Sequence, residues 1–254
     1  MSKLLTFSGK KGSGKSTCFN YCAGRAMKAA NLIVDFEVSD KSNGDLGVVS
    51  YNEDGSPAVG IFDFNLNHPE FVDYLVNIVY PVVTPHNISS PLKRFCVDML
   101  GCDPNCIFGK NVDKNQLTQY QWHLMPFTSD NNPLSRLQDG YMSGREIMQF
   151  WAHDIFRAMD PDIHINAFFR DLEQIQSELV IAVDGRYPNE VEKIQSAGGK
   201  VIRLTRNVYD DQHEGEIALD DYPHEKFDAV IDNQNMTLAQ TIVELEKVLT
   251  GWGW

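Results

Sequence analysis

No stretch of the 254-residue chain approaches the ~18 consecutive apolar residues that a membrane-spanning helix needs. The first residues, Met1 to Gly9, lack the pattern of a secretory signal peptide, so we expect a cytoplasmic protein without membrane association. The five cysteines are odd in number, which favours reduced thiols over a disulfide framework.

Positive charge is scarce as well. The 22 Lys and Arg residues are outnumbered by 35 Asp and Glu residues, which gives a formal net charge of −13. A field of this sign repels nucleic acids and anionic membranes, so we do not expect a nucleic-acid partner. Any substrate that carries phosphate must then be captured by a local positive site.

Internal repeats, low-complexity tracts and long linkers are absent too, so the sequence predicts one domain over residues 1–254. Apolar runs predict buried strands that alternate with helical segments, which is typical of an α/β fold with a parallel sheet covered by helices on both faces. The expected strands are 3–8, 179–184, 201–205 and 228–231. The expected helices are 16–30, 69–80, 91–100, 143–159, 162–176, 189–197 and a last one with Leu238, Ile242, Leu245 and Leu249 on one face.

Residues 31–85 differ in character and are interpreted as an insertion. The segments 48–51 and 59–62 flank Asn52-Glu-Asp-Gly-Ser56, which predicts a β-hairpin whose role as a lid, a dimer contact or decoration stays open. Elsewhere, Ser90 and Asp162 are expected as helix N-caps, and Ser143 with Glu146 forms a predicted capping box.

The strongest motif is Gly9-Lys-Lys-Gly-Ser-Gly14-Lys15-Ser16, which matches G-x-x-x-x-G-K-[ST] at every fixed position between a predicted strand and a predicted helix. Glycines let the backbone wrap an anion, and the helix adds its positive N-terminal end. The motif predicts binding of ATP with Mg²⁺ through Lys11, Gly12, Ser13, Gly14, Lys15, Ser16 and Thr17. Lys15 would reach the β- and γ-phosphates, while the Ser16 hydroxyl would serve Mg²⁺ directly or through water. The alternative is a glycine-rich turn in an unrelated fold.

A second acidic strand end follows at Asp184-Gly-Arg186. Ligands of doubly wound folds bind at the carboxyl ends of the strands, so we expect Asp184 and Arg186 to face the same crevice as the glycine-rich loop. Asp184 could orient Mg²⁺ or accept a proton, and Arg186 could clamp a phosphate. The alternative is that Asp184 caps the next helix and Arg186 lies on the surface.

These segments together resemble the phage-type deoxynucleoside monophosphate kinases, a branch of the P-loop nucleotide kinases. The resemblance covers most of the chain except about residues 31–85, and it rests on five segments in the expected order: Ser90–Lys93, Phe108–Asn111, Arg145–Gln149 with Asp154 and Arg157, Val183–Glu190, and Ala197–Arg206. Two departures stand out. Ala152-His153 replaces the usual Gly-Thr, and His213-Glu-Gly-Glu216 replaces His-x-Ser-Glu.

The resemblance implies a P-loop kinase-like three-layer fold that transfers phosphate from ATP-Mg to a deoxynucleoside monophosphate. Its implied catalytic residues are Lys15, Asp184 and Arg186, and its acceptor-binding residues are Lys93, Arg145, Gln149, Asp184 and Arg186. Arg206 and Asn233 join the ATP site, with Asn233 bordering the adenine. Residues 86–178 would form a helical acceptor-binding region and residues 206–227 a lid. The host cytoplasm is the expected location if a phage encodes the chain, and a homodimer stays open.

Several alternatives remain at this stage. Lys93 could be a solvated helix residue, and Gln149 could serve a buried backbone group. The acceptor could be another small molecule, as in dephospho-coenzyme A kinases, or a hydroxymethylated base. The chain could instead be a nucleotide-hydrolysing switch or assembly ATPase, or a structural nucleotide binder.

Overall fold

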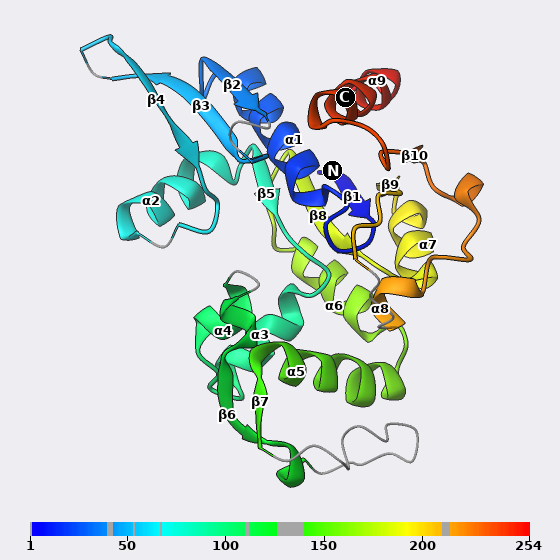
Figure 1. The fold of residues 1–254 in the computed structure, drawn as a ribbon. Helices are drawn as coiled ribbons and strands as arrows, with labels where there is room; N and C mark the ends of the chain where they lie inside the picture. The colour runs from blue at the N-terminus through cyan, green and yellow to red at the C-terminus, as the bar shows by residue number, and fades with distance from the viewer. Residues whose placement is uncertain are drawn as a thin grey trace. The chain divides into compact units, whose positions relative to one another are not determined.

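The computed structural model describes residues 2–39, 43–52, 54–66, 68–109, 112–125, 140–209 and 214–254. The chain forms two compact units (Figure 1). The first unit combines Met1–Asn87 with Ile175–Trp254, and the second is Ile88–Gln174.

The first unit is built on a five-stranded sheet with the order β10-β9-β1-β8-β5, in which every described strand pair is parallel. Its strands are β1 (Lys3–Ser8), β5 (Val83–Pro85), β8 (Leu179–Gly185), β9 (Lys200–Leu204) and β10 (Ala229–Ile231). The predicted parallel sheet is confirmed, and its four predicted strands agree with the observed ones to within about a residue at each end. Only β5 was not expected, because three residues are too short to show a hydrophobic period.

Helices cover both faces of this sheet. On one face, Leu5 and Phe7 of β1 pack with Cys18 and Phe19 of α1 (Lys15–Ala29) and with Leu245 of α9 (Leu238–Gly251). On the other face, Leu4 lies beside Ile194 of α7 (Pro188–Ser196), where the two side chains crowd Gly199. Successive side chains of β1 therefore pack against helices on opposite faces of the sheet, an arrangement compatible with a three-layer α/β fold.

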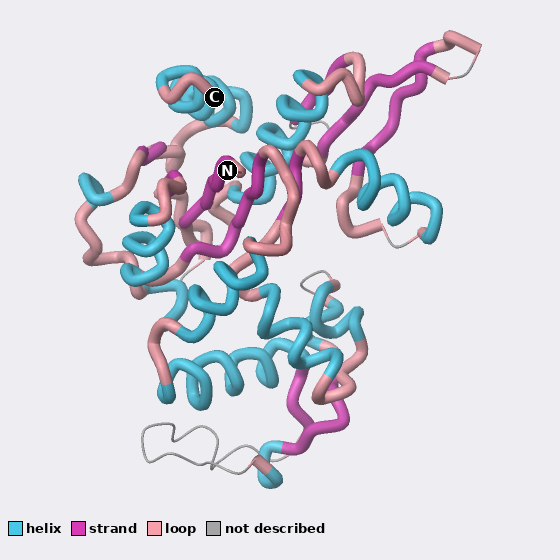
Figure 2. The backbone as a smooth tube through the Cα atoms, turned by 180° about the vertical axis from the view of Figure 1, so that it is seen from behind, coloured by secondary structure: helices cyan, strands magenta, loops and turns pink. Residues whose placement is uncertain are grey.

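The insertion forms a second, antiparallel sheet of β2 (Asp35–Val38), β3 (Leu46–Tyr51) and β4 (Pro57–Phe62), which Figure 2 shows as a ribbon leading away from the parallel strands. The hairpin of β3 and β4 is confirmed, although Glu53 in its turn lies outside the described residues. The prediction missed β2, whose four residues offer only two inward apolar side chains. The helix predicted at 69–80 is α2 (Pro69–Tyr74), which continues as the π-helix η2 (Leu75–Val79).

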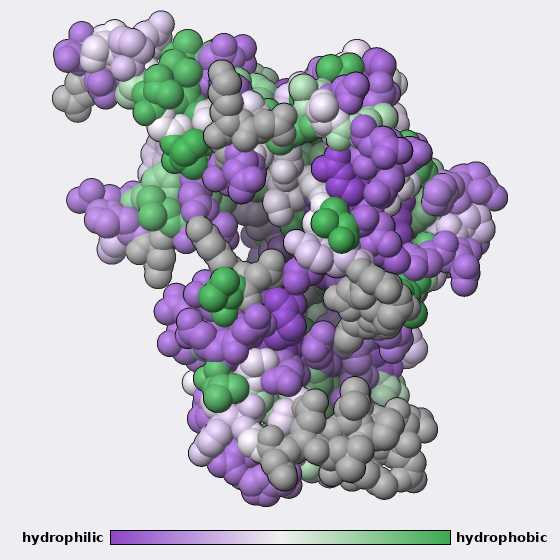
Figure 3. Space-filling model, in the orientation of Figure 1, coloured by the Kyte–Doolittle hydropathy of each residue, from purple (hydrophilic) through white to green (hydrophobic). Residues whose placement is uncertain are grey.

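The two faces of the insertion differ. Phe36 and Leu46 pack against α1 at Gly24, where a Cβ would come within 2.4 Å of the Phe36 ring and 2.8 Å of Leu46. On the other face, Tyr51, Val59 and Ile61 are exposed over 62%, 78% and 59% of their surface. Figure 3 shows hydrophobic surface, in green, in the region of the insertion.

The second unit is mainly helical. Its core contains Leu92, Cys96, Ile107, Ile147 and Phe150, which come from the helices named next. The elements are α3 (Ser90–Asp98), α4 (Pro104–Phe108), η3 (Asp113–Asn115), β6 (Leu117–Gln121), η4 (Trp122–Leu124), β7 (Tyr141–Ser143), α5 (Gly144–Gln149), η5 (Phe150–Arg157) and α6 (Ile163–Leu172). The remaining elements, α8 (Glu214–Ile217) and η6 (His224–Lys226), belong to the first unit.

The predicted helix caps have mixed outcomes. The capping box of Ser143 and Glu146 is confirmed, and the helix runs on as predicted but turns into the π-helix η5 after Gln149. The prediction for Ser90 is wrong, because the N-cap is Ser89 and Pro91 follows inside the first turn. Asp162 stands at the N-cap position of α6 without a capping side-chain bond, and the helix ends at Leu172 rather than near 176.

All five cysteines are buried free thiols, as the sequence predicted. Burial raises the pKa of the Cys18 thiol to about 12. None of the helices that the structure describes has the length and apolar character to cross a membrane.

Candidate functional site

The glycine-rich loop joins the end of β1 to the start of α1 at the carboxyl edge of the parallel sheet. Gly12 and Gly14 have φ values of 79° and 98°, which glycine adopts without a Cβ penalty. Gly14 is the N-cap of α1 and supplies no capping side chain, so the first amides of the helix stay open to a ligand.

The Lys15 ammonium group folds back over this loop. It donates to the Gly9 carbonyl and, at 2.8 Å, to the Lys10 carbonyl. Burial and the nearby Arg186 charge lower the pKa of Lys15 from 10.5 to about 8, although the Glu216 and Asp184 carboxylates act in the opposite direction. A buried ammonium group whose pKa is depressed in this way is well suited to receive an anionic ligand.

The sheet register brings Asp184 and Arg186 to the loop. Ser8 of β1 aligns with Gly185 of β8, so the two strands end side by side. The helix after β8 has Tyr187 as its N-cap, and the Glu190 carboxylate accepts from the backbone N–H groups of Arg186 at 2.8 Å and Tyr187 at 3.1 Å. The alternative that Asp184 caps this helix is therefore wrong.

A further arginine lies at the same edge. Arg203 of β9 is only 8% exposed and donates to the Ser8 hydroxyl at 3.1 Å. Its guanidinium group lies 3.7 Å from the Asp220 carboxylate, which also forms an ion pair with Lys10 at 2.7 Å. Burial lowers the pKa of Arg203. The sequence signal for this residue is an arginine inside the apolar strand Val-Ile-Arg-Leu, which the site prediction passed over.

Asn233 forms a hydrogen bond to the loop, and Arg206 forms hydrogen bonds to Asn233. Asn233 is 1% exposed; its side-chain amide donates to the Ser13 carbonyl at 2.8 Å and accepts from the Arg206 backbone N–H at 2.9 Å. The Arg206 guanidinium group donates to the Asn233 and Met236 carbonyls. Of the two predicted ATP-site residues, Asn233 therefore bonds directly to the loop, whereas the Arg206 side chain bonds to the backbone of Asn233 and Met236.

The remaining loop residues differ in exposure. The Ser13 hydroxyl is buried and has no hydrogen-bond partner among the described residues, whereas Ser16 is exposed at the end of the loop. Thr17 faces the insertion, since a Cβ at Gly44 would come within 2.5 Å of its hydroxyl. The Lys11 ammonium lies 5.3 Å from the centre of the Tyr209 ring, beside Gly12.

The predicted acceptor residues Lys93, Arg145 and Gln149 belong to the second compact unit. Lys93 lies 5.7 Å from the centre of the Phe108 ring, and Arg145 donates to the Asn115 side chain at 3.3 Å. Gln149 is partly buried and follows Arg145 by four residues, so both occupy one face of α5. Outside the described residues lie Lys110 and Asn111, which belong to one of the resembling segments, and His213, which begins one of the two departures from the family pattern.

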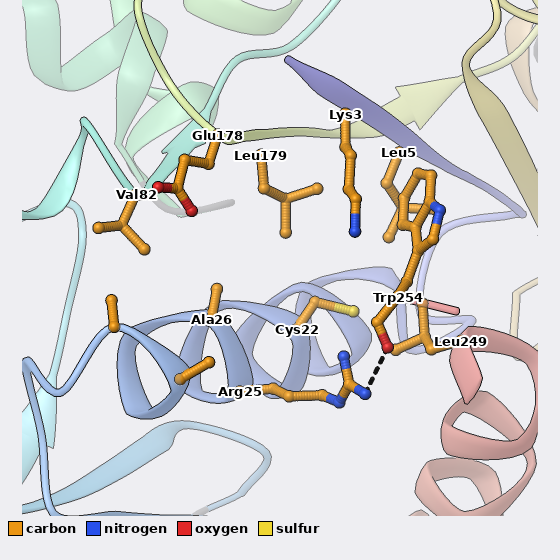
Figure 4. Close-up of a pocket in the computed structure, with 12 residues that line it drawn as sticks. Lys3, Leu5, Cys22, Arg25, Ala26, Val82, Glu178, Leu179, Leu249 and Trp254 are labelled. Carbon is orange, nitrogen blue, oxygen red and sulfur yellow. Dashed lines mark hydrogen bonds between the residues drawn. The ribbon is translucent and has the colours of Figure 1, made fainter. Parts of the chain in front are cut away.

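The cavity in Figure 4 is a separate feature, of about 380 Å³. Lys3 and Leu179, which line it, stand at the amino ends of β1 and β8, at the edge of the sheet opposite the glycine-rich loop. Arg25 donates across this cavity to the Trp254 carbonyl.

Among the described residues, no cluster of three His, Cys, Asp or Glu side chains could hold a metal ion. At the loop, the Ser16 hydroxyl and the Asp184 carboxylate are hard oxygen donors. Protein side chains usually supply only one or two of the oxygen ligands of a Mg²⁺ ion, and phosphates and water supply the others. The donor set therefore fits a nucleotide-bound Mg²⁺.

No known protein family model matches the chain, and a search of curated proteins finds no match.

Proposed function

We propose that the protein transfers a phosphoryl group from ATP-Mg to a deoxynucleoside monophosphate and so forms the diphosphate. The observation that carries this proposal is the glycine-rich loop itself. A backbone amide of the loop, that of Lys11, already donates to a carboxylate at 2.8 Å, and the Lys15 ammonium is buried next to it. Such a loop at the start of a 15-residue helix suits the phosphates of a nucleotide.

The surrounding charges support a phosphate ligand rather than a neutral one. Lys15, Arg186 and Arg203 all lie close enough for the two arginines to lower the pKa of the lysine. In a chain with a net charge of −13, three cations gathered at one strand edge form the local positive site that an anionic substrate needs.

Phosphoryl transfer needs little covalent help from a protein, because it depends on holding two anions in line and neutralising the charge that develops. In the proposed reaction, the loop amides and Lys15 hold the donor phosphates, and Arg186 neutralises charge on the transferring group. Mg²⁺, when bound, would neutralise phosphate charge near Ser16 and Asp184. Asn233 keeps the loop in shape through the Ser13 carbonyl.

The acceptor side is assigned to the second unit. Arg145 lies in the first turn of a capped helix, and Gln149 on the same face offers an amide with both donors and an acceptor for a base. Lys93 and Arg145 supply positive charge for the acceptor phosphate. This assignment rests on the resemblance of the segments 90–93 and 145–149 to the kinase family.

A nucleotide-hydrolysing switch is the second candidate, because the loop residues would serve it equally well. It predicts ATP hydrolysis without any acceptor. A kinase of another small acceptor predicts transfer to an alcohol or phosphate other than a nucleotide.

A screen of acceptors tests the proposal. The protein is incubated with ATP-Mg and each of the deoxynucleoside and ribonucleoside monophosphates in turn, and the formation of ADP and of each diphosphate is measured. We expect at least one deoxynucleoside diphosphate to form in equal amount to ADP. ADP formation at the same rate with and without every monophosphate would support the hydrolysing switch instead.

A further inference from the structure

Glu216 is on the short helix α8, and its carboxylate contacts the glycine-rich loop. One of its oxygens accepts from the Lys11 backbone N–H at 2.8 Å, and the other accepts from the Arg186 guanidinium group. The Glu216 side chain is only 7% exposed. The adjacent Gly215 carbonyl also accepts from Arg186, at 3.2 Å.

These donors are the ones that a nucleotide phosphate would use. Backbone N–H groups of a glycine-rich loop bind anionic oxygens, and an arginine fork binds carboxylates and phosphates with the same geometry. A carboxylate with two oxygens and a phosphate with three therefore compete for the Lys11 amide and for Arg186. The two anions cannot occupy the same donors at once.

The contact is part of a firmly held segment. Leu219 and Tyr222, just after α8, are 2% and 8% exposed, and Asp220 forms the 2.7 Å ion pair with Lys10. The burial of Leu219 and Tyr222 keeps α8 next to the loop. The Glu216 carboxylate therefore has a high effective concentration at the loop. Figure 1 shows α8 beside the loop between β1 and α1.

We propose that Glu216 is an internal competitor of the nucleotide, whose carboxylate fills the phosphate site of the free protein and must leave when phosphates bind. The inference rests on the proposed function, since it assumes that the loop binds phosphates. The apparent affinity for a phosphate ligand is then lowered by the fraction of molecules in which Glu216 occupies the site. Occupancy by Glu216 also keeps Arg186 paired until a nucleotide arrives.

The test measures the binding of inorganic tripolyphosphate by calorimetry, so that neither acceptor nor turnover enters. Glu216→Gln keeps the length of the side chain but removes its charge. We expect it to bind tripolyphosphate about ten- to a hundredfold more tightly than wild type, because a charge-assisted contact to the competing group is lost. Glu214→Gln is the matched control, since Glu214 is exposed on the same helix and the charge change is the same. Its affinity should equal that of wild type.

The remaining outcomes separate this inference from the proposed function. Unchanged or weaker binding by Glu216→Gln, together with loss of binding in Lys15→Met, overturns the inference and leaves the phosphate site intact. No binding by wild type or any variant overturns both. If Glu216→Gln does not fold, Glu216→Asp replaces it, since the shorter side chain keeps the charge but withdraws from the Lys11 amide. It should also bind tripolyphosphate more tightly than wild type.

Discussion

Lys15 carries its charge at a position where burial disfavours an ammonium group. Its pKa is about 8 in the folded protein against 10.5 as the ordinary value. The unfolded chain therefore binds more protons between these two pH values, and folding stability from this residue rises as the pH increases from about 8 to about 10.5. Below pH 8 the buried charge costs stability.

The variant Lys15→Met tests how much stability the buried charge of Lys15 removes. We expect it to exceed wild type in free energy of unfolding at pH 7 by up to about 3 kcal/mol, less the lost bonds to the Gly9 and Lys10 carbonyls. The advantage should shrink at pH 9.5, where wild-type Lys15 is largely neutral. Urea unfolding of both proteins at the two pH values measures it. If the difference in free energy of unfolding between the two proteins is the same at both pH values, burial of the Lys15 charge does not lower the stability of wild type.

Asp184 is the second residue whose role can be isolated. Asp184→Asn keeps the shape of the side chain but removes its negative charge from the site around Lys15. We expect the melting temperature to stay close to that of wild type and turnover to fall about a hundredfold or more, because the charge matters in the transition state. Melting curves and initial rates of Asp184→Asn and Asp184→Ala decide this. An active Asp184→Asn protein would remove Asp184 from the catalytic residues.

The sequence placed the glycine-rich loop between a strand and a helix because the spacing of the loop residues is fixed by a local motif. Their partners could not be predicted in the same way. Glu216 and Asp220 come from a segment about 200 residues away, and only the fold brings them to Lys11 and Lys10. Spacing in the chain contains no signal for such pairs, although the buried arginine in β9 gives a hint of the site.

At the scale of elements, Gly24 marks one of several places where α1 packs against the insertion. A Cβ at Gly24 would meet the Phe36 ring and Leu46, so Gly24→Ala should destabilise the protein by about 1–3 kcal/mol through overpacking, partly offset by better helix propensity. Gly251→Ala, in helix α9 with nothing within 4 Å of the new Cβ, is the matched control. It should stabilise the protein by up to about 1 kcal/mol. Chemical denaturation measures both, and an equal effect of the two substitutions would contradict the proposed contact.

Arg145, in the first turn of α5, tests the division between donor and acceptor sites. Arg145→Ala should raise the Michaelis constant for the monophosphate about ten- to a hundredfold, lower turnover and leave ATP binding nearly unchanged, because a charge-assisted contact is lost. Arg170→Ala removes the same charge from an exposed position of α6 and should change neither constant. If the affinity for ATP falls as steeply as the affinity for the monophosphate, the assignment of Arg145 to the acceptor site is wrong.

Elements with a strong period or a cap were predictable, and short ones were not. The capping box at Ser143 fixed the start of α5, and the apolar runs fixed β1 and β8. In contrast, β2 and β5 have four and three residues, which is too few for a pattern. The change to a π-helix at Phe150 has no signal in the local sequence pattern.

For the molecule as a whole, the negative charge and the basic loop act together. A net charge of −13 repels polyanions at long range, whereas Lys15, Arg186 and Arg203 attract a phosphate locally. If the protein is the proposed kinase, this combination would favour a small phosphate-bearing substrate over a nucleic acid.

The most direct test of the central claim follows the fate of the γ-phosphate. ATP labelled at that phosphate is mixed with Mg²⁺ and the best deoxynucleoside monophosphate, using wild type and Lys15→Met. We predict that wild type places the label in the deoxynucleoside diphosphate and that Lys15→Met, although folded, transfers almost none. Label released only as inorganic phosphate, or transfer by Lys15→Met at the wild-type rate, would contradict a nucleotide kinase built on this loop.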